Sequence, residues 1–282
     1  MRKDIFLPSL ALAGGIGGFF LRRWQLASAY VPETGLFTRG APATFALLGL
    51  LALLALAFAL LTRHKEGPED FLPAFRSPEA GQMAALVISW LLMTLAGSLG
   101  MMAGFKGLRL WRAAPDMYQL SVPVSQLLTG GLCVLGGFGV LYMGRMAYRE
   151  RLGRAECWFA PFPAFAALIW LFACHLQHGT EPVLMKYGFQ LAAALALTLA
   201  HYFLAGFLFG RPRRHLTLFL SLLGPAVGIT ALADRPDWFT SAALAAFSLS
   251  ALTFARALLR NTFGPPWPER MPPVEEENMD DA

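Results

Sequence analysis

The stretch from Ala43 to Thr62 contains no charged side chain. An α-helix needs roughly 20 predominantly apolar residues to cross the hydrocarbon core of a bilayer, and this stretch has that length. Lipid offers no hydrogen-bond partners, so a segment inside it must satisfy its backbone groups internally, as a helix does. The stretch therefore predicts a membrane-spanning α-helix.

Seven further apolar blocks share this character. Hydrophobic residues make up 56% of the chain and charged residues 15%, whereas a soluble domain carries about 25% charged residues. We expect an all-α fold, a polytopic transmembrane helical bundle of about eight spans within residues 1–262. The expected spans are residues 5–29, 43–62, 82–105, 122–147, 158–178, 187–210, 215–233 and 239–260.

The two ends of the chain differ from the blocks between them. Arg22 and Arg23 separate the first apolar block from the small residues at 27–29, so we interpret this block as an uncleaved span and not as a signal peptide. Residues 263–282 contain several prolines and the acidic run at 275–277. Such a composition cannot bury enough apolar surface to fold, which predicts a disordered acidic tail.

Basic residues cluster between the apolar blocks and not along a continuous face. This arrangement favours contact with membrane lipids over nucleic acid, although the net charge is +5. Of the 23 Lys and Arg residues, 15 fall on the side that holds both termini and 8 on the other. Cytoplasmic loops are the richer in Lys and Arg. We therefore expect a multi-pass protein of the cell (plasma) membrane with both termini in the cytoplasm.

A basic cluster on the opposite side is a candidate site for an anion or a lipid headgroup. The segments Leu21–Trp24 and Leu108–Trp111 share a Leu-Arg-x-Trp pattern. If the first and third spans are neighbours, the guanidinium groups converge, and arginine binds phosphate or carboxylate at two points. The alternative is that these side chains extend to the interface beside tryptophan anchors. The candidate residues are Arg22, Arg23, Arg39, Arg109 and Arg112.

His201 is the ionisable residue placed deepest inside a predicted span, which makes it a candidate intramembrane polar site. The alternative is a neutral imidazole bonded to a neighbouring helix. His175 lies close to the opposite end of its span, so the two rings are too far apart to ligate one haem iron. The three cysteines have no metal-ligand spacing. The sequence therefore indicates no cofactor and no metal site.

Glycine and proline mark places where helices pack closely or bend. Gly224 and Pro225 stand near the middle of the seventh span and predict a helix kink or break, because proline removes a backbone donor. The first, third and fourth spans are rich in glycine, with Gly14 and Gly18 spaced for close helix contact. We interpret these glycines as packing surfaces, with a substrate path as the alternative.

The sequence leaves three functions open. It contains none of the motifs of phosphate-binding loops, zinc peptidases or serine hydrolases and has no acidic residue in the middle of a span, which favours a non-enzymatic role. The functions are a transporter or a small-molecule- or lipid-binding membrane protein, a membrane anchor or assembly subunit with a protein partner or a second copy of the chain, and a lipid-modifying enzyme. In size and span number the chain is similar to the membrane anchor subunits of respiratory molybdenum oxidoreductases, which bind quinol. That likeness covers no motif.

Overall fold

The computed structural model describes residues 2–63, 67–178, 186–265 and 267. Within them, eight helical segments are long and apolar enough to cross a membrane, which confirms the predicted transmembrane bundle. They are α1 (Lys3–Ser28), α2 (Pro42–Leu61), α4 (Ala80–Ala113), α5 (Ser121–Arg149), α6 with α7 (Arg154–Cys157 and Phe162–His178), α8 with η2 (Gly188–Gly206 and Phe207–Phe209), α9 with η3 (Arg214–Ala231 and Leu232–Asp234), and α10 (Trp238–Phe263). Most of the predicted acidic tail lies outside the described residues.

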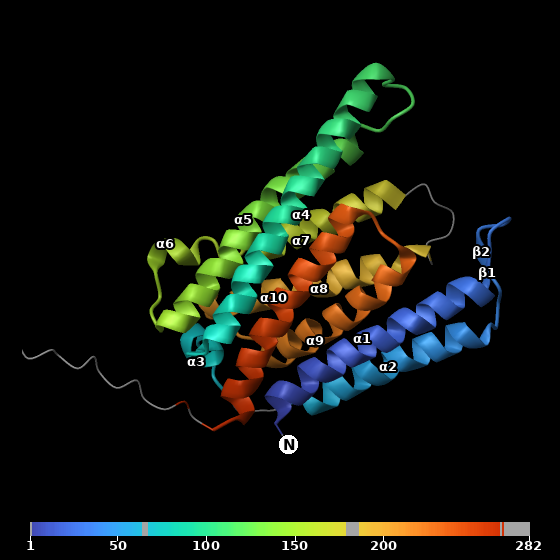
Figure 1. Cartoon of the computed structure of the whole chain (residues 1–282). Helices are drawn as coiled ribbons and strands as arrows, with labels where there is room; N and C mark the ends of the chain where they lie inside the picture. Colours follow the sequence, from blue (N-terminus) through green and yellow to red (C-terminus); the bar gives the residue numbers. More distant parts are fainter. Residues whose placement is uncertain (1, 64–66, 179–185, 266, 268–282) are drawn as a thin grey trace, which may run out of the picture.

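Helix α10 occupies the centre of the bundle (Figure 1). It packs against α1 and α9 on one flank and against α4 on the other, and most of its side chains are buried. The N-terminus and the C-terminal end of α10 lie at the same end of the bundle, where the Lys3 Nζ atom lies 4.0 Å from the centroid of the Phe263 ring. We call this the proximal end and the opposite one the distal end.

Helix α4 is longer than the predicted span, which ended at residue 105. It continues to Ala113 because Lys106, Arg109 and Arg112 end the apolar run without disfavouring helix. With a rise of about 1.5 Å per residue, α4 is about 51 Å long, well beyond the roughly 30 Å of a hydrocarbon core. The hairpin of α4 and α5 accordingly projects past the other helices at the distal end (Figure 1).

Glycines allow the long helices to approach closely. A Cβ atom on Gly97 of α4 would lie 2.6 Å from the carbonyl oxygen of Gly130 on α5. On α1, a Cβ on Gly15 would lie 2.9 Å from Ile229 of α9, and one on Gly18 would meet Thr230. Partner helices therefore fill the glycine-rich faces, as expected where small residues replace a hydrophobic driving force.

Of the kink or break predicted for the seventh span at Gly224 and Pro225, the break does not occur. Helix α9 continues from Arg214 to Ala231 through Pro225, although Pro225 supplies no N–H to the preceding turn. Gly224 is buried against Leu197 of α8, and a Cβ there would lie 3.0 Å from the Leu197 side chain. This pair therefore serves the contact between α8 and α9.

Shorter elements close the two ends. At the distal end β1 (Tyr30–Val31) pairs antiparallel with β2 (Leu36–Phe37) between α1 and α2. At the proximal end α3 (Phe71–Phe75) packs beneath α10.

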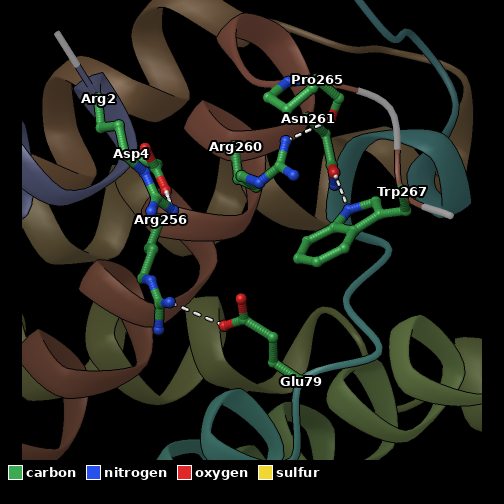
Figure 2. A network of polar contacts seen from close by, with 8 residues as sticks. All are labelled: Arg2, Asp4, Glu79, Arg256, Arg260, Asn261, Pro265 and Trp267. Atoms are coloured by element: carbon green, nitrogen blue, oxygen red, sulfur yellow. Dashed lines mark hydrogen bonds and ion pairs between the residues drawn. The ribbon is translucent and has the colours of Figure 1, made fainter.

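Polar contacts fasten the proximal end of α10 (Figure 2). Arg256 donates to Glu79, just before α4, over 2.7 Å. Asn261 donates to the carbonyl oxygens of Ala74 and Arg76 over 2.9 Å each and accepts from the indole N–H of Trp267 over 2.7 Å. The last helix is thereby tied both to the α3 segment and to the start of the tail.

Candidate functional site

A groove with a volume of about 1270 Å³ opens between α7 and α8 at the proximal end. Its lining comes from the first turns of α7, the last turns of α8, and the loop that leads into α9. These residues are Pro161, Ala164, Phe165, Leu168, Thr198, Leu199, Tyr202, Phe203, Ala205, Gly206, Phe209, Gly210, Arg211, Pro212 and Arg213.

A tight turn ends α8 and η2 at the proximal end of the groove and leads the chain into α9. Gly210 adopts φ 66°, a left-handed conformation that glycine accepts without steric cost. The N–H of Arg211 then donates to the Gly206 carbonyl oxygen over 2.8 Å, and Pro212 prevents the helix from continuing. Phe207 anchors the turn in the core, with its ring centroid 5.0 Å from that of Phe75.

The walls of the groove are apolar. Phe165, Tyr202 and Phe209 expose 51%, 58% and 57% of their surfaces, so their rings are available to a ligand. Thr198 donates its hydroxyl to the Ala194 carbonyl oxygen over 2.7 Å, so this hydroxyl proton is already used within α8. An alkyl chain can therefore lie along the groove without stranding a buried polar group.

Positive charge gathers at one end of the groove. Arg211 and Arg213 are exposed, and neither forms a salt bridge with any residue that the structure describes. The Tyr202 side chain, with its hydroxyl group, lines the same groove. The groove thus has the polarity of an amphiphile, apolar along its length and cationic at its proximal end.

Arg22, a candidate from the sequence, lies inside the bundle and not at its surface. It is fully buried, and its Nε donates to Asp234 Oδ1 over 2.7 Å while its Nη1 donates to Gln25 Oε1 over 2.6 Å. Its guanidinium carbon lies 5.1 Å and 4.9 Å from the ring centroids of Phe37 and Phe189. Arg22 therefore forms an internal ion pair that joins α1 to η3.

The other candidate arginines are exposed. Helix α1 packs against α2, α9 and α10, whereas α4 packs against α5 and α10. The distal ends of α1 and α4 lie far apart in Figure 1, so the structure does not bring Arg22 and Arg109 together. Arg23, Arg39 and Arg112 likewise face away from the protein interior.

His201 lies in the core between α8 and α10. Its Nδ1–H donates to the Leu197 carbonyl oxygen over 2.8 Å, which leaves Nε2 to accept from the Ser250 hydroxyl over 2.8 Å. The ring meets Phe247 edge-on, with 5.3 Å between their centroids. It thus occupies the position of an imidazole bonded to a neighbouring helix, and it does not line the groove. Within the described residues, no cluster of three His, Cys, Asp or Glu side chains could hold a metal ion.

Sequence reasoning missed the groove. Arg211 and Arg213, which directly follow the aromatic segment Phe207–Phe209, were counted only toward the charge bias between the two sides. The closeness of these arginines to Tyr202 in the sequence was a signal for the groove. The opposite wall comes from α7, however, and the position of α7 beside α8 depends on how the helices pack. Comparison of the chain with protein-family models, curated proteins and solved structures gives no match.

Proposed function

We propose that this multi-pass membrane protein binds a membrane amphiphile with one long alkyl chain and an anionic head, in the groove between α7 and α8. The observation that carries the proposal is the polarity of the groove, whose apolar walls lead to Arg211 and Arg213 at the proximal end. The volume of about 1270 Å³ exceeds the roughly 300–1000 Å³ of ordinary small-molecule pockets and suits an extended chain.

Selectivity in such a site resides in the head. A chain that moves from bulk lipid into the groove leaves one apolar environment for another and gains little from the hydrophobic effect. A guanidinium group, in contrast, offers a carboxylate or phosphate two parallel hydrogen bonds. We therefore expect the groove to discriminate by head charge and only weakly by chain length.

Photolabelling of the full chain in phosphatidylcholine vesicles tests the proposal. Two probes are compared, a fatty acid with a diazirine in its chain and the matching fatty alcohol, and the labelled residues are mapped by mass spectrometry. The acid is expected to label Phe165, Leu168 and Phe203 more strongly than the alcohol does. Leu53 and Leu56 on α2, which expose 66% and 56% of their surfaces, report labelling from bulk lipid.

The charge requirement is tested by Arg211→Gln/Arg213→Gln. This double variant should lower acid labelling of the groove to the level of the alcohol. Arg23→Gln/Arg39→Gln removes the same charge from exposed positions at the distal end and should leave groove labelling unchanged. Equal groove labelling by acid and alcohol in the unmodified protein would contradict the proposal.

A further inference from the structure

We propose that a second, smaller hollow, formed by the C-terminal end of α5 and by α6, binds a phosphate group. The hollow has a volume of about 210 Å³ and is lined by Arg145, Arg149 and Arg151 together with Glu156. None of these residues lines the groove between α7 and α8, so the inference does not depend on the function proposed above.

The backbone brings the three arginines to one place. Arg145 and Arg149 stand four residues apart on α5 and therefore share a helix face. Glu150 ends the helix in the left-handed conformation, with φ 56°, and the N–H of Arg151 returns to the Met146 carbonyl oxygen over 3.3 Å. This turn folds Arg151 back beside the last turn of α5.

The acidic residues nearby do not balance this charge. Glu156 Oε1 lies 3.8 Å from Arg145 Nε, at the long end of the range for an ion pair. The Glu150 carboxylate, which does not line the hollow, pairs with Arg76, with 3.1 Å between Oε2 and Nε. The hollow therefore has one carboxylate for three guanidinium groups, and a bound anion would relieve the repulsion among them.

The size and surroundings of the hollow indicate the ligand. Its volume is below the roughly 300 Å³ at which drug-sized pockets begin, so it suits a single phosphate group. Leu152 and Trp158 beside it expose 56% and 73% of their surfaces. Exposed tryptophan is typical of the headgroup region, and basic pockets between spans bind phosphorylated headgroups there. A phospholipid headgroup and free phosphate both supply this chemistry.

Native mass spectrometry of the full chain, titrated with phosphatidylglycerol in mild detergent, tests the proposal. We assign about 1 kcal/mol to each arginine that lines the hollow, so each of these removed should weaken binding about fivefold. Arg149→Gln/Arg151→Gln is compared with Arg23→Gln/Arg39→Gln, which removes the same charge at exposed positions far from the hollow, at the distal end. Only the first pair should lose affinity, and Glu156→Gln should raise it, because it removes the competing carboxylate.

The two sources of phosphate are separated by competition. Displacement of phosphatidylglycerol by excess inorganic phosphate at constant ionic strength would assign the hollow to the phosphate group itself, and retention would assign it to the lipid headgroup. Either result supports the proposal, provided that Arg149→Gln/Arg151→Gln weakens the binding of phosphatidylglycerol. Equal losses in the two double variants would overturn the proposal. The proposal would also be overturned if the acidic run at 275–277 were the occupant of the hollow. In that case, replacing the run with Gln would raise the affinity for phosphatidylglycerol, and would do so only while Arg149 and Arg151 are present.

Discussion

Arg22 shows how a charge is accommodated inside the bundle. An unpaired charge taken out of water costs several kcal/mol, and geometry decides whether a partner offsets that cost. Asp234 supplies the opposite charge, and Gln25 occupies a second donor while its own amide donates to the Thr44 hydroxyl over 2.8 Å. The ion pair therefore connects α1 to η3 and, through Gln25, to α2.

Replacing Arg22 tests this structural role. Arg22→Gln should lower the free energy of unfolding by about 3–5 kcal/mol, because it leaves the Asp234 carboxylate buried without its counter-charge. The measurement is thermal or denaturant unfolding in detergent, followed by size-exclusion chromatography. Arg23→Gln alters the next residue, which is exposed, and should change stability by less than about 0.5 kcal/mol.

A second substitution distinguishes the loss of the Arg22–Asp234 ion pair from an unspecific loss of stability. Arg22→Gln/Asp234→Asn removes both charges and should recover part of the loss seen with Arg22→Gln alone. If Arg22→Gln proves as stable as Arg23→Gln, the ion pair is not what holds α1 to η3.

At this scale the sequence singled out Arg22 but could not identify its role. The partner is 212 residues away, in η3 at the end of the seventh span. An arginine at the end of an apolar run is equally consistent with an interface anchor, an anion ligand or one partner of an ion pair. Only the packing of α1 against α9 decides among these, because it brings Asp234 to the guanidinium group.

At the scale of elements, helix contacts depend on where glycine leaves room for a neighbouring backbone. Gly97 and Gly130 face each other across α4 and α5, and a Cβ on either would lie 2.6 Å or 2.7 Å from the carbonyl oxygen of the other. Gly131, the next residue along α5, has no neighbour within 4 Å of its would-be Cβ. Adjacent glycines therefore have opposite tolerance for a side chain.

Alanine substitutions test that difference. Gly97→Ala and Gly130→Ala should each lower the free energy of unfolding by about 1–3 kcal/mol, because the clash is with backbone and can be relieved only by separating the helices. The measurement is reversible unfolding in detergent monitored by circular dichroism. Gly131→Ala is the matched control and should be neutral or slightly stabilising. Equal losses at residues 130 and 131 would show that close approach of α4 and α5 is not the cause.

The sequence predicted the existence of the eight spans better than their ends. Apolar length fixes where a chain can cross lipid, so every predicted span corresponds to a described helical segment. The predicted fifth span, residues 158–178, nevertheless begins before α7, which starts only at Phe162, and α4 continues past Lys106. Hydropathy registers polarity and not helix continuity, which explains why it placed the ends of these two spans wrongly.

At the scale of the whole molecule, the start of α1 and the end of α10 share the proximal end, which is the side that the sequence predicts to be the richer in Lys and Arg. The groove and the smaller hollow both open there, each beside arginines. If the proximal end faces the cytoplasm, both proposed sites contact the leaflet whose surface is rich in anionic lipid.

Labelling of introduced cysteines tests the orientation. With a membrane-impermeant maleimide on intact cells, Arg39→Cys at the distal end should react, whereas Arg63→Cys at the proximal end should react only after permeabilisation. Both positions are exposed, and the native Cys133 and Cys174 are buried. The unmodified protein serves as the background control. The reverse pattern would place both termini outside.

The central position of α10 has a consequence for how the protein is made. Spans enter the membrane in chain order, yet α10 is both the last span and the one that α1, α4, α8 and α9 all contact. Until α10 is inserted, the faces of the earlier spans that contact it have no final partner. Arg22 likewise has no counter-charge until Asp234, 212 residues later in the chain, has been synthesised. An assembly that lacks only α10 therefore exposes the faces of α1, α4, α8 and α9 that this helix covers in the finished bundle.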